Sequence, residues 1–355
     1  MMQKRVVAML GLLLITSSLV WAKPWSVAVF CDSRGVGTGE EGSTQGVRSS
    51  VLRAIAADAC REHVALVVFP GDQVNGSAKY GTLAEQLLAW KTAMAPLYHA
   101  HIPIYSFRGN HENQQEAPVK VWDAIFPDLP KNGPKGQEDL TYSVRFQNAE
   151  FIGFDQYVGR SATFDTGKYD DAVNTGIVSP WVLAQITNAP TPWVFVFGHE
   201  PAFIAHHTDC LANAPAERDA LWEALGARNG VYFCGHDHLY VRRTAPDSHG
   251  HPVTELIVGC AGAPNYPYDH EALNTRYDQH VAPTAQFVNA TPTREMPNTN
   301  GSPFYFGYLI ITVDGNTATG RWKAFINYDY AHWDAPPHPV FRVLDSFVLK
   351  TSSKK

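Results

Sequence analysis

The chain has 355 residues, of which 45% are hydrophobic and 17% are charged, and its formal net charge is −6. A chain of this length and composition can bury one large hydrophobic core. Its acidic balance disfavours nucleic acids and anionic membrane surfaces as partners, because both recruit Lys and Arg.

The N-terminal segment has the three parts of a secretory signal peptide. A basic region with Lys4 and Arg5 precedes an apolar run, and small residues at Val20 and Ala22 suit a cleavage site. We therefore expect residues 1–22 to be removed and the protein to be periplasmic or secreted, without stable membrane insertion. Losing Lys4 and Arg5 would lower the net charge of −6 by two, to −8. An uncleaved membrane anchor is the alternative, since the apolar run approaches spanning length.

An apolar strand followed at once by a polar, Gly-containing loop recurs along the chain. Such near-continuous apolar runs are typical of strands buried on both faces. The expected strands are 25–31, 64–70, 102–108, 193–198 and 230–234. Amphipathic patterns predict helices over Thr44–His63, Tyr80–His99, Pro180–Asn188 and Pro215–Arg228. This alternation predicts an α/β fold whose chemistry collects at the carboxyl ends of the strands.

Two parts of the chain break the alternation. Residues 140–156 predict a hairpin that turns at Gln147 and Asn148, and 253–259, 304–327 and 341–350 predict antiparallel strands. We therefore expect one domain over 23–355, built as a two-sheet β-sandwich flanked by helices. Residues from about 263 to 303 lack periodicity and are expected to form a long irregular loop, either a lid or a disordered segment.

The five cysteines are too few and too scattered for a disulfide scaffold. Cys31, Cys234 and Cys260 lie in apolar runs and are expected in the core. One disulfide that involves Cys60 or Cys210 remains open, and the odd number leaves at least one free thiol. The sequence does not fix the oligomeric state.

The stretch VYFCGHDHLY places His236 and His238 just after a predicted strand. Alternate residues of an extended chain point to one side, and Gly235 permits a sharp turn, so the two imidazoles can converge. Convergent neutral imidazoles are typical of transition-metal sites. A surface or capping role is the simpler reading of either histidine alone.

Other strand ends carry further candidate metal ligands. Asp32, Asp72, Asn110, His111, His199, His236 and His238 all follow predicted strands. Carboxylate oxygens, an amide oxygen and imidazoles suit one or two divalent ions such as manganese, iron or zinc. Each residue alone also fits a helix cap, a turn or an ordinary buried histidine, but their joint placement at the strand ends favours the metal site.

The motif order D-x-x, GD-x-x-N-G, GNHE, GHEP and GHDH, from Asp32 to His238, resembles that of the calcineurin-like metallophosphoesterases. The chain would be a secreted, bacterial-type member. The resemblance implies a β-sandwich flanked by helices and hydrolysis of a phosphomonoester or phosphodiester by a metal-activated water. It also implies roles at the site. Asp72 would bridge two metals, Asp32 and His238 would hold the first, and Asn110, His199 and His236 would hold the second. His111 would protonate the leaving oxygen.

Two residues depart from the family pattern. Arg34 stands where members usually have the His of Asp-x-His, and it has no lone pair to give a metal. We expect Arg34 to bind substrate phosphate and to weaken the first metal position; a salt bridge with Asp32 or a nearby Glu is the alternative. Asn75 stands where many members have an Asp, or in purple acid phosphatases a Tyr, and we expect it near the substrate, with a hydrogen bond to His111.

The departure at Arg34 keeps a second function open. A non-catalytic protein that binds metal or phosphate on the same fold is the alternative to the enzyme. The substrate is also open, because nucleotides, cyclic nucleotides, phosphoproteins and lipid headgroups all carry phosphoesters.

Overall fold

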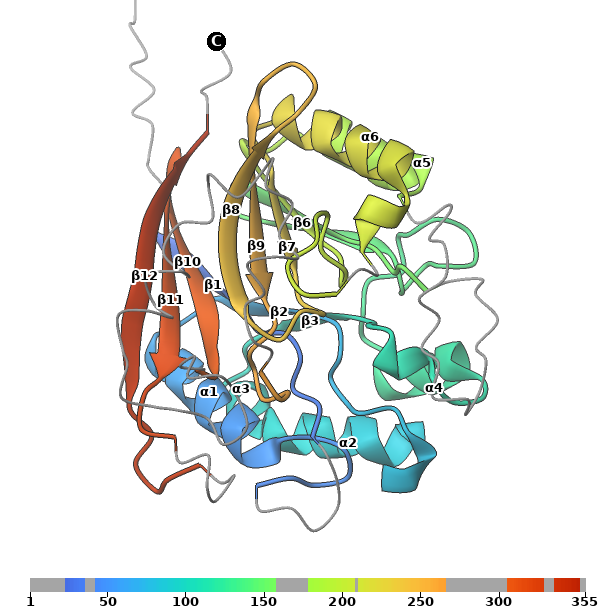
Figure 1. The fold of residues 1–355 in the computed structure, drawn as a ribbon, viewed down its shortest axis with the longest axis vertical. Helices are drawn as coiled ribbons and strands as arrows, with labels where there is room; N and C mark the ends of the chain where they lie inside the picture. The colour runs from blue at the N-terminus through green and yellow to red at the C-terminus, as the bar shows by residue number, and fades with distance from the viewer. Residues whose placement is uncertain are drawn as a thin grey trace, which may run out of the picture.

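The structure is a computed structural model that describes residues 23–35, 42–157, 178–207, 210–265, 305–328 and 335–351. It contains two six-stranded sheets with helices on their outer sides (Figure 1). The predicted two-sheet α/β architecture flanked by helices is confirmed.

The first sheet has the strand order β12-β11-β10-β1-β2-β3. Its strands are β1 (Trp25–Val29), β2 (Leu66–Pro70), β3 (Ile104–Phe107), β10 (Gly307–Asp314), β11 (Thr317–Phe325) and β12 (Phe341–Lys350). The first three run parallel to one another, and β10, β11 and β12 continue the sheet antiparallel. The parallel half of this sheet therefore brings the ends of β1, β2 and β3 to one edge.

The second sheet has the strand order β4-β5-β6-β7-β9-β8. Its strands are β4 (Tyr142–Phe146), β5 (Ala149–Gly153), β6 (Trp193–Phe197), β7 (Val231–Cys234), β8 (Tyr240–Pro246) and β9 (Pro252–Val258). The strands β5, β6, β7 and β9 are parallel. The predicted hairpin is β4 and β5, and it turns at Gln147, whose φ is 52°.

The helices lie on two sides of the sandwich. They are α1 (Ser49–Arg61), α2 (Leu83–Ala93), α3 (Ala95–His99), α4 (Pro118–Ile125), α5 (Pro180–Asn188) and α6 (Pro215–Gly226), with short 3₁₀ turns at Ala78–Tyr80, His111–Asn113 and Leu211–Asn213. Figure 1 shows α1, α2 and α3 gathered on one side of the molecule and α5 with α6 on another. The two groups cover the outer faces of different sheets, because α1 and α2 share one hydrophobic cluster with β1 and β2, and α5 and α6 share another with β6 and β7.

Two predicted helices were too long. The helix over Thr44–His63 begins only at Ser49, because Thr44 and Val47 exchange two backbone hydrogen bonds of 2.9 and 3.0 Å in a tight turn. The helix over Tyr80–His99 is divided, since α2 ends at Ala93 and α3 begins with Pro96 in its first turn. Proline has no N–H for the preceding turn, so it is tolerated at the start of a helix and not inside one.

The sequence pattern did not predict β8 and α4. The strand β8 lies at the edge of the second sheet and pairs antiparallel with β9. It starts at Tyr240, two residues after His238, so the loop that carries both histidines is held between two strands, β7 and β8.

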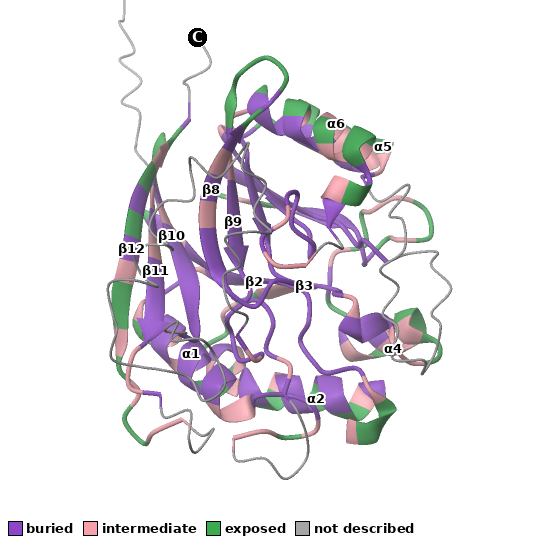
Figure 2. Cartoon of the chain, in the orientation of Figure 1, coloured by how far each residue is buried: buried purple, intermediate pink, exposed green. Residues whose placement is uncertain are grey.

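Aromatic residues fill the interior between the sheets. Trp25 of β1 contacts Phe151 of β5, with ring centroids 6.0 Å apart, and Tyr240 of β8 stacks on Trp322 of β11 at 4.6 Å. Figure 2 shows both sheets buried along most of their strands, whereas β12 consists mostly of exposed and partly buried residues. A rigid, close-packed interior fixes the positions of the strand ends that carry the polar residues.

All five cysteines lie in the described residues, and each is a free thiol. Cys60 and Cys210 therefore form no disulfide. Within the described ranges, no helix combines the length and apolar character needed to cross a bilayer. The expected signal peptide over 1–22 lies outside the described residues, as does most of the expected loop over 263–303.

Candidate metal centre

The predicted site residues come from both sheets and meet at one edge of the sandwich. Asp32, Asp72 and Asn110 follow the adjacent parallel strands β1, β2 and β3, while His199 and His236 follow β6 and β7. All five loops leave the carboxyl ends of parallel strands. The structure thus brings together residues from loops that lie more than 200 positions apart in the chain, as between Asp32 and His236, whose separation is 204.

The backbone is strained at three of these residues. Asp32, Asp72 and His236 have φ values of 60°, 54° and 67°, in the left-handed region that non-glycine residues usually avoid. Each such residue costs about 1–2 kcal/mol, and such strain concentrates at functional sites. The fold therefore accepts a local cost in order to turn these side chains toward one another.

Glycines next to the candidate ligands allow the loops to approach closely. A Cβ at Gly109 would lie 2.2 Å from Asp72 Oδ1, and one at Gly235 would lie 2.1 Å from Asp32 Oδ2. Any larger residue at either position would displace a carboxylate of the site. This explains why GNHE and GHDH both begin with glycine.

The residues expected to hold the second metal are Asp72, Asn110, His199 and His236. We call these four residues the second donor set. His199 Nε2 lies 3.3 Å from Asp72 Oδ1 and 3.2 Å from Asn110 Oδ1. Its other ring nitrogen, Nδ1, lies 3.0 Å from the Pro70 carbonyl oxygen. Because that carbonyl can only accept, Nδ1 carries the proton and Nε2 presents a lone pair to two oxygens. Three converging lone pairs suit a cation, and a carbonyl behind the ring is the usual support for a metal-binding histidine.

His236 is the fourth member of this set. Its backbone N–H donates to Asp32 Oδ2 at 3.0 Å, and its ring centroid lies 5.2 Å from that of His199. The His207 ring lies 4.8 Å from it on another side. His236 is almost buried, with 6% of its surface exposed. The chemistry of the second donor set, two imidazoles with a carboxylate and an amide oxygen, fits a divalent ion.

Asp32, Asp72 and His238 offer one donor atom each within 4.8 Å of one another, and we call them the first donor set. His238 Nε2 lies 3.6 Å from Asp32 Oδ1, and its Nδ1 donates to the Pro264 carbonyl at 2.8 Å. Asp32 Oδ1 is buried and has no hydrogen-bond partner among the residues that the structure describes. An orphaned carboxylate oxygen next to an imidazole lone pair is an arrangement that a positive charge would stabilise.

Arg34 lies within reach of this first donor set. Its Nε–H donates to His238 Nε2 at 3.2 Å, and the same nitrogen lies 3.7 Å from Asp72 Oδ2. The predicted alternative was a salt bridge with Asp32 or a nearby Glu, whereas the ion pair seen here is with Asp72. A metal ion at the first set would require the His238 lone pair that Arg34 already uses. In this arrangement the first set does not fit a metal ion.

Burial and charge together set the ionisation of the site. Burial raises the pKa of Asp72 to about 6, against the opposing charge of Arg34. Burial, and then the Asp72 carboxylate, raise the pKa of Asp32 well above its ordinary value. Burial and the Arg34 charge lower the pKa of His111 and of His238 well below the usual range. These two imidazoles are therefore neutral near pH 7.

His111 lies next to Asp72. Its Nδ1–H donates to the backbone carbonyl of Asn75, and its Nε2 lies 3.7 Å from Asp72 Oδ2. The expected hydrogen bond between Asn75 and His111 is made by the Asn75 backbone carbonyl, whereas the Asn75 side-chain amide donates to the Gly35 carbonyl at 2.8 Å. A backbone carbonyl performs the orienting role, which any residue at position 75 can supply. Asn75 instead ties the loop after β1 to the loop after β2.

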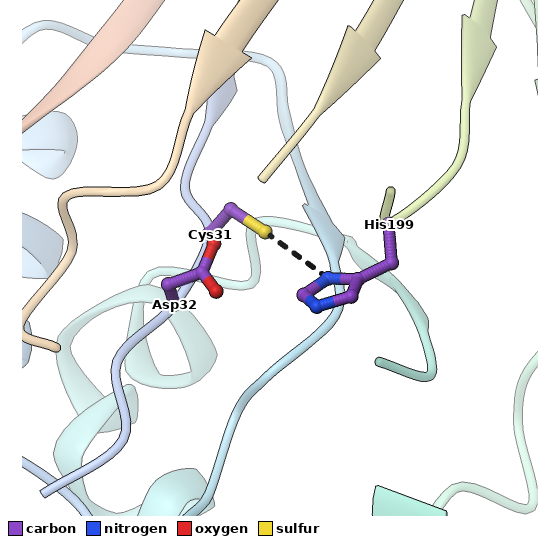
Figure 3. A group of neighbouring side chains, drawn as sticks. All are labelled: Cys31, Asp32 and His199. Atoms are coloured by element: carbon purple, nitrogen blue, oxygen red, sulfur yellow. Dashed lines mark hydrogen bonds between the residues drawn. The ribbon is translucent and has the colours of Figure 1, made fainter. Parts of the chain in front are cut away.

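Cys31 is a neighbour of the site that the sequence placed only in the core. Figure 3 shows its sulfur pointing toward the His199 ring, with Sγ 3.9 Å from Nδ1 and the Asp32 carboxylate alongside. The thiol donates to the Gly71 carbonyl at 3.2 Å, and burial raises its pKa well above the ordinary value. Since His199 Nδ1 is protonated toward Pro70, these three side chains do not present converging lone pairs, and Cys31 acts as packing behind the ligands.

Glu112 is the residue that sequence reasoning missed. Its carboxylate accepts from the backbone N–H groups of Asp72, Val74 and Gly109 at 3.0, 3.1 and 2.7 Å. It therefore joins the loops after β2 and β3, on which Asp72 and Asn110 stand. The available signal was its place in the GNHE motif, where an acidic residue follows two site residues.

Comparisons with known proteins identify the family and the fold. The sequence profile of the calcineurin-like phosphoesterases matches residues 45–240. No curated protein matches the chain in sequence. Among solved structures, the chain is similar to a purple acid phosphatase from yellow lupin, Lupinus luteus, at 15% identity and a TM-score of 0.58, over 93% of this chain and 54% of that one. The chain thus spans about half the length of the lupin protein.

Two further structures share the fold along nearly all of this chain. A dimetal phosphatase from Danio rerio is 15% identical at a TM-score of 0.56, over 92% of this chain and 99% of that one. GAP50, described as the anchor in the inner membrane complex of Plasmodium, is 13% identical at a TM-score of 0.56, over 94% and 90%. These likenesses concern the fold, whereas the profile match covers more than half of the chain and includes four of the five motifs. The chain therefore belongs to the calcineurin-like phosphoesterases, which are metal-dependent hydrolases of phosphoester bonds.

Proposed function

We propose that this protein hydrolyses phosphomonoesters or phosphodiesters outside the cytoplasm, at the edge where the two sheets meet. A divalent ion, manganese, iron or zinc, would be held by Asp72, Asn110, His199 and His236. The observation that carries the proposal is the lone pair of His199 Nε2, which faces Asp72 Oδ1 at 3.3 Å and Asn110 Oδ1 at 3.2 Å. When bound, the ion would lower the pKa of a water and withdraw charge from the phosphate oxygens.

The residues of this chain would supply the remaining steps. Attack of water breaks the bond between phosphorus and the leaving oxygen, and that oxygen then needs a proton. His111 is placed to give one, because its Nδ1–H is held by the Asn75 carbonyl and its Nε2 lies 3.7 Å from Asp72 Oδ2, at the proposed site. Burial keeps this imidazole neutral in the free protein, and a phosphate anion beside Nε2 favours the protonated form.

Arg34 would bind the phosphate. A guanidinium offers several donors in a plane, a geometry that matches two phosphate oxygens. Its side chain is 18% exposed, whereas the Asp72 side chain beside it is 1% exposed, so Arg34 is the more accessible of the two. Asn75 supports this arrangement indirectly, through its hydrogen bond to the loop that carries Arg34.

A panel of phosphoesters tests the proposal. The purified protein would be treated with a chelator and assayed on nitrophenyl monoesters and diesters, nucleotides and cyclic nucleotides, with and without added Mn²⁺. We expect Mn²⁺-dependent release of phosphate or alcohol, loss of turnover in His199→Ala, and no change in His99→Ala, whose histidine is exposed on α3. Binding of metal and phosphate without turnover on any ester would favour the non-catalytic alternative.

A further inference from the structure

We infer that the Arg34 guanidinium permanently fills the first cation position, so that the centre holds a single metal ion rather than a pair. The inference rests on the proposed function, because it concerns the same site. Under this inference, the positive charge next to Asp32 and Asp72 comes from the protein itself and not from a metal ion.

Arg34 contacts two of the side chains, His238 and Asp72, that a metal ion in the first donor set would need as ligands. Its Nε lies 3.2 Å from His238 Nε2 and 3.7 Å from Asp72 Oδ2. A metal–imidazole bond is about 2.0–2.1 Å long and uses the nitrogen lone pair. The N–H of Arg34 already occupies that lone pair, and a guanidinium keeps its protons at any working pH. A metal ion and Arg34 therefore cannot share His238 at the same time.

The backbone around Arg34 is held firmly. Gly35 N–H donates to the Gly46 carbonyl at 2.8 Å, and Arg34 forms a β-bridge with Val47. On the other side, the Ser33 hydroxyl donates to the Gln73 carbonyl at 2.8 Å. The first two contacts close the loop after β1 on itself, and the third ties it to the loop after β2. The guanidinium is thus carried by an ordered segment and reaches His238 from a defined direction.

His238 has a different role under this inference. Its Nδ1–H is committed to the Pro264 carbonyl at 2.8 Å, so Nε2 is the acceptor and can receive the N–H of Arg34. His238 is then a positioning residue for Arg34 instead of a metal ligand. In the second donor set, His199 Nε2 faces two acceptor oxygens, Asp72 Oδ1 at 3.3 Å and Asn110 Oδ1 at 3.2 Å.

Metal content separates a single ion from a pair. The full chain would be loaded with excess Mn²⁺, desalted, and analysed for Mn²⁺ per chain by mass spectrometry and for its paramagnetic resonance spectrum. We expect one ion per chain with the spectrum of an isolated Mn²⁺ ion. His199→Ala should lose most of this ion, whereas His238→Ala should retain it.

A gain of metal is the complementary test. Arg34→His removes the competing cation and supplies an imidazole, so Mn²⁺ should rise to two per chain and the spectrum should become that of an exchange-coupled pair. Arg53→His, at an exposed position of α1, is the matched control and should bind as the unmodified protein does. If Arg34→His fails to fold, the number of Mn²⁺ ions bound per chain by the unmodified protein and by His238→Ala still distinguishes one ion from two.

The outcomes that oppose the inference are distinct from those that oppose the proposed function. Two tightly held ions per unmodified chain, or loss of the single ion in His238→Ala, would overturn the single-ion centre and leave phosphoester hydrolysis intact. No bound Mn²⁺, together with no metal-dependent turnover, would refute the proposed function, and the inference would fall with it.

Discussion

The Glu112 carboxylate accepts a hydrogen bond from the backbone N–H of Asp72 at 3.0 Å. This contact holds the Asp72 backbone, whereas the Asp72 side chain lies beside His199 and Arg34. Asp72 has a left-handed backbone with φ of 54°, so its peptide needs external support. Glu112 supplies that support and also binds the N–H groups of Val74 and Gly109.

Replacing Glu112 should therefore lower stability. Glu112→Ala leaves three buried N–H groups without acceptors, at about 1–3 kcal/mol each. Glu112→Gln keeps one oxygen and should cost less, because its amide faces only part of the cluster. Urea unfolding would measure the free energies, and Glu116→Gln at an exposed position serves as the control. Equal stability of Glu112→Ala and the unmodified protein would contradict this role.

Removing a ligand of the second donor set should weaken the binding of the metal ion. Asn110→Ala and His236→Ala should each weaken Mn²⁺ binding by at least about 10- to 100-fold, since outer-shell changes alone reach that range. Elemental analysis after dialysis against dilute chelator would measure occupancy, with His101→Ala, exposed next to α3, as the control. A variant that keeps full occupancy would remove that residue from the list of ligands.

His111→Ala should have another signature. The metal content should stay intact, because His111 Nδ1 is bound to the Asn75 carbonyl and lies outside both donor sets. Turnover of alkyl phosphates should fall by about 10²–10⁴-fold. The loss should be smaller for nitrophenyl esters, whose leaving group needs no proton. Equal losses for both kinds of ester would show that His111 is not the acid.

Arg34→Ala should weaken the binding of phosphate. A charge-assisted hydrogen bond contributes about 1.5–3 kcal/mol, so competitive inhibition by inorganic phosphate should weaken by about 10- to 100-fold. Arg53→Ala, on the exposed face of α1, is the matched control. Unchanged inhibition in Arg34→Ala would mean that the guanidinium serves the site without touching phosphate.

Export of the protein can be tested at its N-terminus. The signal sequence predicts cleavage after Ala22, so the exported protein should begin at Lys23. N-terminal sequencing of the protein from the periplasm or culture medium would measure this. An intact Met1 on a membrane-bound product would instead support the uncleaved anchor.

The sequence by itself determined the elements whose signals are local. The apolar runs that end in Asp32, Asp72 and Asn110 predicted β1, β2 and β3, because strands buried on both faces need continuous hydrophobic residues. The turn at Gln147 and the helix over Pro180–Asn188 were likewise read from neighbouring residues. The same patterns placed the candidate ligands at strand ends, since the carboxyl ends of parallel strands share an edge.

Only the tertiary structure decided how those ends face one another. Arg34 and His238 are 204 positions apart, and nothing local relates a guanidinium after β1 to an imidazole before β8. The Asn75 carbonyl, rather than its side chain, orients His111, and Glu112 supports the Asp72 backbone. These contacts depend on the register of two packed sheets to within about an ångström. Periodicity fixes which face a residue occupies, whereas hydrogen-bond geometry follows from close packing across the sandwich.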